Sequence, residues 1–199
     1  EGDEPLPYYH AAIESMDYEI GRLLNSMTAT DKENLIILFI GDNGSPNQVA
    51  QSPYSSRTVK GTVYQGGINT PLFIAGKGVT RRGRDANLVN STDLFATIAS
   101  LAGATTNGIY DSKSIVELLT TDKKTRDFQY SELRNNDGSE TWTIRKMNYK
   151  LIVNSNGSDQ LYHLRTDPYE KMNLLNNSLD AEAIMAKELL EAELLLIRN

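Results

Sequence analysis

The chain has 199 residues, no cysteine and a formal net charge of -6, and its length allows one large domain or one and a half. The acidic balance argues against broad binding to nucleic acid or anionic membranes. Without cysteine there is no disulfide framework, thiolate nucleophile or cysteine-based zinc site. No apolar segment is long enough to span a membrane. Because the first residue is Glu1 and not methionine, a processed product, a recombinant product and a fragment all stay open.

An acidic, proline-containing lead-in, residues 1–7, precedes apolar residues at helical spacing, which predicts an amphipathic helix. These apolar positions are Tyr9, Ile13, Met16, Ile20, Leu23 and Met27. A polar link over residues 28–34 follows. The two histidines, His10 and His163, lie far apart in sequence, and neither is assigned a role.

Residues 35–40, LIILFI, predict a strand covered on both faces, as in a parallel sheet, because the apolar run does not alternate. Asp42 and Asn43 follow at its carboxyl end, where such sheets place their ligand sites. We expect the chain to turn there, aided by Gly44, so that both side chains can reach one ion. The alternative is an ordinary turn, since Asp-Asn-Gly is also common turn chemistry.

A long segment without hydrophobic period, residues 45–59, predicts a loop, and loops of this length are usually functional or disordered. It leads into residues 60–67, KGTVYQGG, whose three glycines indicate close backbone approaches or unusual dihedral angles. Taken alone, Lys60 is an ordinary solvated lysine. Pro71 opens a second predicted strand over residues 72–75.

Four basic residues then cluster in a glycine-punctuated loop, most simply as surface charge: Lys77, Arg81, Arg82 and Arg84. Ser91 or Thr92 can cap a helix that Gly103 stops. Its expected core stripe is Leu94, Phe95, Ile98, Leu101 and Ala102. A short helical pattern follows over residues 114–119.

From about residue 127 the pattern changes to short strand-like runs separated by turn residues, which favours antiparallel hairpins. The runs cover residues 128–133, 141–145, 149–153 and 160–164. A closing helix is predicted over residues 180–197, with Ile184, Leu189 or Leu190, and Leu194 on its inner side. We therefore expect an α/β segment over residues 1–110, a connection over 111–126 and a small α+β subdomain over 127–199.

Three motifs in this order resemble the C-terminal portion of a sulfatase of the alkaline-phosphatase-like superfamily. They are GDNG at residues 41–44, KGTVYQGGINTP at residues 60–71, and LYHL, DPYE and NL between residues 161 and 174. NYKLI at residues 148–152 adds to the likeness, which covers nearly the whole chain. The implied fold class is α/β: the C-terminal part of an α/β/α sandwich, followed by a small antiparallel sheet with a packed helix.

The resemblance implies site roles for three residues. Asp42 and Asn43 would supply oxygen ligands to one divalent cation, usually Ca²⁺ with Mg²⁺ possible, and hard oxygen ligands suit both ions. Lys60 would contact the sulfate group. Relatives that act on phosphate esters with two metals typically carry Asp-His at the strand end, so Asn43 favours the one-metal sulfatase arrangement.

Other parts of a sulfatase site are not found in this sequence. The family nucleophile is a formylglycine made from Cys or Ser in a Cys/Ser-x-Pro-x-Arg motif, and no proline here has arginine two positions later. Two ligands also cannot fill the six to eight positions of calcium. We therefore expect an N-terminal half of the same enzyme to supply the nucleophile and further ligands, and this chain to be inactive alone.

The implied activity is hydrolysis of an aryl or carbohydrate sulfate ester. The alternatives are a phosphoesterase of the same superfamily and a non-catalytic homologue that binds sulfated glycans. The natural substrate cannot be read from these residues. Because members of the resembled family are usually exported, the resemblance implies a location in the periplasm or outside the cell.

Overall fold

The computed structural model describes residues 4–105 and 110–198. The chain divides into two compact units, Glu1–Val79 and Thr80–Asn199, and each is described by itself. No helix of the described residues combines the length and the apolar character that a membrane span needs. The expected division of the chain into residues 1–110, 111–126 and 127–199 stays a prediction.

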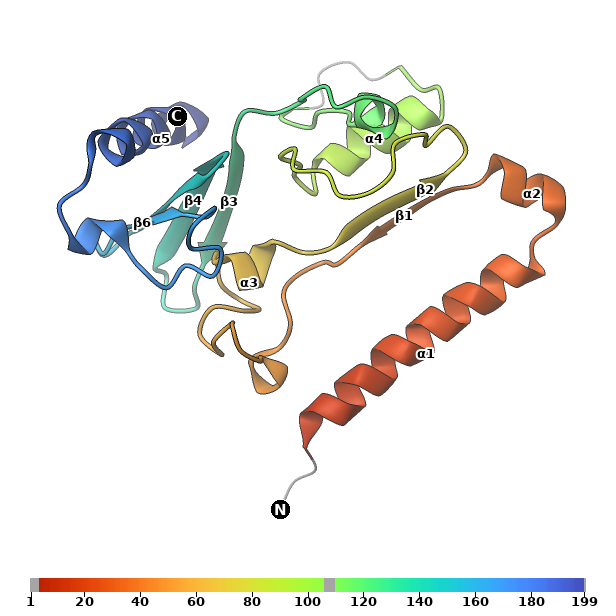
Figure 1. The fold of residues 1–199 in the computed structure, drawn as a ribbon, viewed down its shortest axis with the longest axis horizontal. Helices are drawn as coiled ribbons and strands as arrows, with labels where there is room; N and C mark the ends of the chain where they lie inside the picture. The colour runs from red at the N-terminus through yellow and green to blue at the C-terminus, as the bar shows by residue number, and fades with distance from the viewer. Residues whose placement is uncertain (1–3, 106–109, 199) are drawn as a thin grey trace. The chain divides into compact units, whose positions relative to one another are not determined.

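The first unit begins with the helices α1 (Pro5–Ser26) and α2 (Ala29–Asn34), as Figure 1 shows. The predicted helix is confirmed, but the lead-in is not separate from it, because α1 begins at Pro5 and proline fits the first turn of a helix. The polar link is also helical: Thr28 caps α2 by accepting a hydrogen bond from the Asp31 N–H. The apolar stripe of α1 is largely exposed, and Leu23 is 58% exposed.

The predicted strand is β1 (Ile36–Ile40), and it pairs with β2 (Leu72–Gly76). Their pairing is antiparallel, with Phe39 opposite Phe73, so the expected parallel arrangement is wrong for these two strands. Full burial is also wrong, since β1 is half-buried over residues 36–39. An unbroken apolar run shows that both faces are apolar, but it carries no information on the direction of the neighbouring strand.

The connection from β1 to β2 holds two short helical turns, η1 (Asn47–Val49) and α3 (Gln65–Ile68). The loop predicted over residues 45–59 is interrupted by η1, and residues 50–64 contain no helix or strand. Helix α1 packs against η1, so the start of this connection is held against the first helix.

The second unit begins with α4 (Asp93–Leu101) and η2 (Val116–Leu119). Gly103, at φ 71°, ends α4 as predicted. The expected core stripe of α4 is wrong, because Phe95 is 61% and Ile98 53% exposed. The buried residues of α4 are instead Asp93, Ala96 and Thr97.

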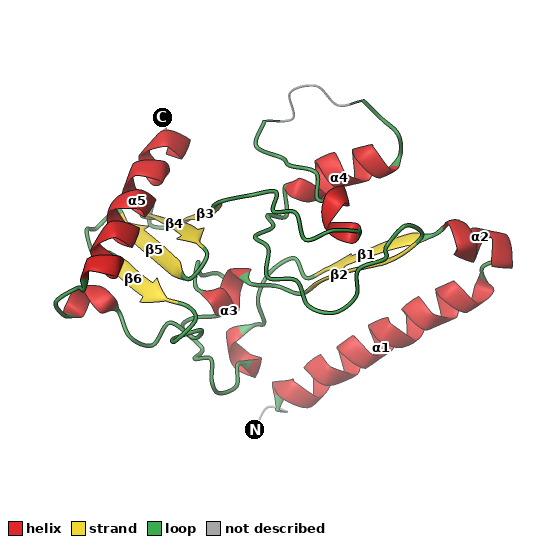
Figure 2. Cartoon of the chain, turned by 45° about the horizontal axis from the view of Figure 1, so that its top comes forward, coloured by secondary structure: helices red, strands yellow, loops and turns green. Residues whose placement is uncertain are grey.

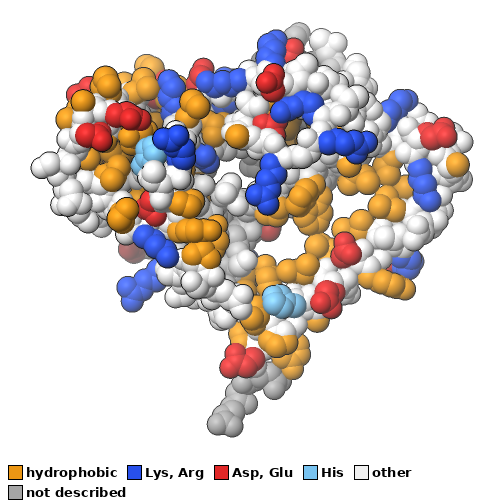
Figure 3. All heavy atoms as spheres, in the orientation of Figure 1, with side chains coloured by type: hydrophobic (Ala, Val, Ile, Leu, Met, Phe, Trp, Pro, Cys, Tyr) orange, Lys and Arg blue, Asp and Glu red, His pale blue; other side chains and the backbone are white. Residues whose placement is uncertain are grey.

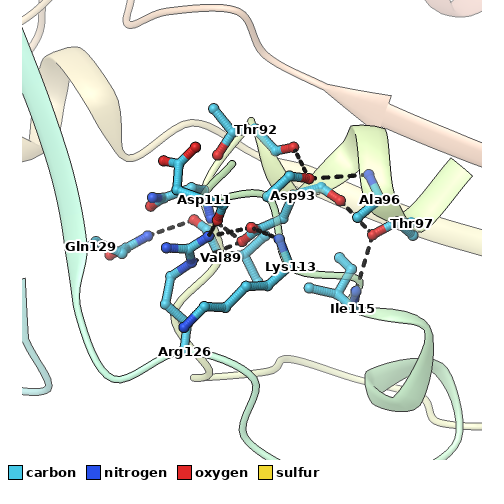
Figure 4. A network of polar contacts seen from close by, with 12 residues as sticks. Val89, Thr92, Asp93, Ala96, Thr97, Asp111, Lys113, Ile115, Arg126 and Gln129 are labelled. Atoms are coloured by element: carbon cyan, nitrogen blue, oxygen red, sulfur yellow. Dashed lines mark hydrogen bonds and ion pairs between the residues drawn. The ribbon is translucent and has the colours of Figure 1, made fainter. Parts of the chain in front are cut away.

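Asp93 explains why that face of α4 is turned inward (Figure 4). Its carboxylate accepts hydrogen bonds from the Asn90 and Lys113 N–H groups, at 2.9 and 2.8 Å, and forms a buried ion pair with Arg126. Thr97 adds a bond from the Ile115 N–H, at 3.0 Å. A buried carboxylate requires such partners, so the chain after α4 packs on the face that carries Asp93.

The rest of the unit is a four-stranded antiparallel sheet in the order β3-β4-β5-β6, which confirms the predicted hairpins. The strands are β3 (Gln129–Arg134), β4 (Glu140–Lys146), β5 (Tyr149–Asn154) and β6 (Gln160–His163). The turn η3 (Leu174–Asn176) leads to the closing helix α5 (Ala181–Arg198).

Helix α5 lies against one face of this sheet, as Figure 2 shows, and packs on β4 and β5. The core between them consists of Trp142, Ile144, Leu151, Leu161, Ala183, Leu190 and Leu194. Leu190 and Leu194 are therefore correctly predicted as inner residues, whereas Ile184 is 43% and Leu189 44% exposed. Near the end of α5, the Arg198 guanidinium stacks over the Trp142 ring at 3.6 Å from its centroid.

Candidate functional site

The candidate site lies in the first unit, where β1 ends in the sequence Gly41-Asp42-Asn43-Gly44. The Gly41 N–H donates to the Pro71 carbonyl, and the Gly44 N–H donates to the Gly67 carbonyl, each at 2.9 Å. Both bonds tie the strand end to the segment that precedes β2. Asp42 and Asn43 lie between these two anchors, so their backbone is held at both ends.

Glycine is required here for a close approach of two backbones. A Cβ atom on Gly44 would lie 1.9 Å from the Gly66 carbonyl oxygen, and one on Gly66 would lie 2.3 Å from the Thr58 oxygen. Gly67 is as crowded, with the Thr62 oxygen 2.2 Å from its Cβ position. Side chains cannot be accommodated at such distances. Gly44 has no positive φ, so this packing, and not the unusual turn expected from sequence, explains it.

The same packing brings Lys60 to the strand end. Its N–H donates to the Ser45 carbonyl at 3.1 Å, two residues after Asn43. Gly61 follows at φ 82°, a conformation that favours glycine. The expected glycine-dependent approaches and dihedral angles of residues 60–67 are therefore both present, and the backbones that carry Asp42, Asn43 and Lys60 meet in one region.

The side chains of Asp42 and Lys60 are exposed, and that of Asn43 is half-buried. The Asp42 carboxylate accepts the N–H of Asn43, at 3.0 Å. Among residues 4–105 and 110–198, neither Asp42 nor Lys60 has an oppositely charged partner within ion-pair distance. A negative and a positive group are thus both available to a ligand.

The oxygen atoms of Asp42 and Asn43 suit a hard divalent cation. They are an incomplete ligand set, because the described residues contain no group of three His, Cys, Asp or Glu side chains that could hold a metal ion. Asp42 and Asn43 therefore fit a cation to which further ligands are supplied by other residues, and their roles and that of Lys60 stay predictions.

One residue next to the site was not singled out from the sequence. The Tyr9 hydroxyl of α1 lies 3.2 Å from the Ser45 hydroxyl, across 36 residues of sequence. Tyr9 appeared only as one apolar position of a helix, and Ser45 only as the first residue of a loop. No local pattern could have predicted that these two side chains meet.

Two family models match the chain. One, described as Sulfatase, matches residues 2–104, and the other, described as N-sulphoglucosamine sulphohydrolase, C-terminal, matches residues 58–197. The chain belongs to the sulfatase family. Its motifs at residues 41–44, 60–71 and 161–174 are thus those of a sulfatase, as their resemblance implied.

Individual relatives agree with this assignment. A sulfatase from Formosa agariphila is 31% identical over 84% of this chain, and an arylsulfatase from Clostridium perfringens is 25% identical over 88%. The match covers 35% and 37% of those two proteins, so the chain spans about a third of their length. The activity of a whole sulfatase therefore cannot be assigned to this chain from the match alone.

Solved structures show the same fold. A putative sulfatase from Bacteroides thetaiotaomicron superposes with a TM-score of 0.67 and 25% identity, covering 83% of this chain and 36% of that one. A phosphonate monoester hydrolase from Silicibacter pomeroyi, 20% identical, superposes with a TM-score of 0.72 over 92% of this chain and 38% of that one. The fold class is thus confirmed as the C-terminal part of the alkaline-phosphatase-like α/β architecture.

Proposed function

We propose that the complete protein is a sulfuric ester hydrolase, and that this chain supplies part of its cation and sulfate site. The observation that carries the proposal is the convergence of Asp42, Asn43 and Lys60. Glycine-to-glycine packing holds their backbones together, and the charged groups of Asp42 and Lys60 are exposed. Membership of the sulfatase family gives this arrangement its chemistry.

The proposed roles follow from charge. Asp42 and Asn43 would hold a divalent cation, Ca²⁺ in preference to Mg²⁺. When bound, such an ion draws negative charge away from a sulfuryl oxygen. Lys60 would place its ammonium beside the sulfuryl group and so stabilise the negative charge that develops as the ester bond breaks. The expected formylglycine nucleophile has no candidate among these 199 residues, and we place it in the N-terminal half.

The substrate class we propose is a carbohydrate sulfate, with aryl sulfates as convenient assay substrates. The C-terminal family model, over residues 58–197, is named for an enzyme of sulphoglucosamine. A further structural neighbour was solved in complex with its substrate, D-glucosamine-2-N,6-O-disulfate. At 21% identity, its likeness to this chain is a likeness of fold. Family habit supports export from the cytoplasm, which N-terminal sequencing of the mature protein would test.

The direct test is turnover of an aryl sulfate by the full-length protein and its variants. Lys60→Ala and Asp42→Ala should each lower kcat/KM by about 100-fold or more, because each removes preorganised charge from the site. Lys32→Ala and Asp17→Ala, at exposed positions of α2 and α1, are the matched controls. Near wild-type turnover in either site variant would contradict the assignment.

Two further arms separate the alternatives. A phosphoesterase would prefer aryl phosphate to aryl sulfate, and a glycan-binding homologue would bind sulfated glycan without hydrolysing it. Calorimetric titration with Ca²⁺ gives a readout other than activity: affinity should fall in Asp42→Ala and stay unchanged in Asp17→Ala.

A further inference from the structure

Helix α1 reaches the candidate site through one side-chain contact. Tyr9 is half-buried on a helix that has no fully buried residue, and its hydroxyl lies 3.2 Å from that of Ser45. Ser45 in turn accepts the Lys60 N–H through its carbonyl oxygen, at 3.1 Å. Ser45 therefore contacts α1 with its side chain and Lys60 with its backbone.

The strand end has anchors of its own that do not involve Tyr9. Asp42 and Asn43 are held by the bonds from Gly41 to Pro71 and from Gly44 to Gly67. Lys60 lies within residues 50–64, which contain no helix or strand, and among the described residues its side chain makes no hydrogen bond or ion pair. Loss of the contact between Tyr9 and Ser45 would therefore reach Lys60 through Ser45, while the two bonds that anchor Asp42 and Asn43 stay in place.

We propose that Tyr9 is a positioning residue that holds Lys60, through Ser45, at a fixed place beside the strand end. This inference rests on the proposed function. Lysine carries its charge on a flexible four-carbon chain, so the position of its backbone limits where the ammonium can reach. Small displacements of a group that must face a reacting centre are costly in rate. Tyr9 itself does not touch the substrate.

The experiment compares Tyr9→Phe, Ser45→Ala and their double variant in the full-length protein. Each single variant should lower kcat/KM for an aryl sulfate about 2- to 10-fold, the range expected for one net hydrogen bond. Inhibition by inorganic sulfate should weaken by a similar factor, while Ca²⁺ affinity stays unchanged. The double variant should be no worse than either single one, because both remove the same contact. Tyr110→Phe, at a fully exposed tyrosine outside the candidate site, is the control and should change nothing.

Lys60→Ala decides whether Tyr9 acts through Lys60. In the Lys60→Ala variant, adding Tyr9→Phe should not weaken inhibition by inorganic sulfate any further. If Tyr9→Phe caused a general loss of structure, it would weaken this inhibition a second time. An additive effect, or a fall in Ca²⁺ affinity that equals the loss in sulfate affinity, would overturn the positioning role. If Lys60→Ala alone left sulfate affinity unchanged, the proposed function would fail instead. Hydrogen exchange at the Lys60 amide tests the contact independently of activity: it should be faster in Tyr9→Phe, and an unchanged rate would overturn the inference.

Discussion

At the scale of single residues, the DPYE motif at residues 167–170 has a structural role in this chain. Glu170 pairs with Lys150 of β5 at 2.5 Å, and both side chains are 1% exposed. Glu170 adopts φ 54°, a conformation uncommon for a residue with a side chain. Asp167 accepts the N–H groups of Lys171 and Met172, at 3.0 and 2.8 Å. The acidic residues of the motif thus cap a turn and neutralise a buried lysine.

The pH dependence of stability should show this burial. Removal from water lowers the pKa of Lys150 from 10.5 to about 8, although the Glu170 carboxylate opposes the shift. Between these two values the unfolded chain binds a proton that the folded chain has lost, so the contribution of Lys150 to stability should rise with pH from about 8 to 10.5. Urea denaturation of wild type against Lys150→Met, across this range, isolates the effect. A difference that is constant or falls with pH would contradict it.

At the scale of elements, α4 is fixed by a buried carboxylate more than by apolar packing. Asp93, the first residue of α4, is fully buried. Its carboxylate accepts hydrogen bonds from the backbone of Asn90 and Lys113 and from the Arg126 guanidinium. The Arg126 guanidinium also donates to the Asp111 carbonyl, at 2.8 Å. Three separate stretches of chain therefore depend on one side chain, as Figure 4 shows.

Substitution should distinguish Asp93 from its neighbour Asp111. Asp93→Ala leaves Arg126 buried without its counter-charge and should cost about 3–5 kcal/mol of stability. Asp111→Ala removes only an exposed side chain, because its contact with Arg126 is made by the backbone, and should stay within about 0.5 kcal/mol. Chemical denaturation measures both. Equal losses would show that the ion pair is not what holds this face of α4.

At the scale of the whole molecule, the described residues leave much apolar surface uncovered. Phe73 of β2 is 64% exposed, and in α1 Tyr18 is 69% and Leu23 58% exposed. Figure 3 shows apolar side chains at the surface over α1. A sheet of two strands is marginally stable by itself, and large exposed apolar patches usually mark a contact surface. Since the match covers only 35% and 37% of the two relatives, we expect the rest of the enzyme to cover this surface.

Phe73→Ser tests that expectation. In the 199-residue chain, which should not hydrolyse aryl sulfate, the substitution should change stability little and lower the binding of a hydrophobic dye. In the full-length protein the same change should cost about 3 kcal/mol or more, as for an aromatic side chain lost from a core. Equal effects in both proteins would mean that Phe73 stays exposed in the complete enzyme.

The sequence by itself determined the elements and the family. Strand β1, the four hairpin strands and α5 follow from hydrophobic periodicity and turn residues, which report local backbone preference. The motifs at residues 41–44 and 60–71 likewise predicted Asp42, Asn43 and Lys60 as site residues. Such a prediction needs only the identity and order of residues along the chain.

Only the tertiary structure decided which elements pair and which faces are buried. Three features depend on groups that lie far apart in sequence. They are the antiparallel pairing of β1, the inward face of α4, and the contact between Tyr9 and Ser45. Periodicity shows that a face is apolar, yet the need of Asp93 for hydrogen bonds outweighed the apolar stripe of α4. Long-range polar contacts of this kind leave no local signal, so no reading of neighbouring residues could have predicted them.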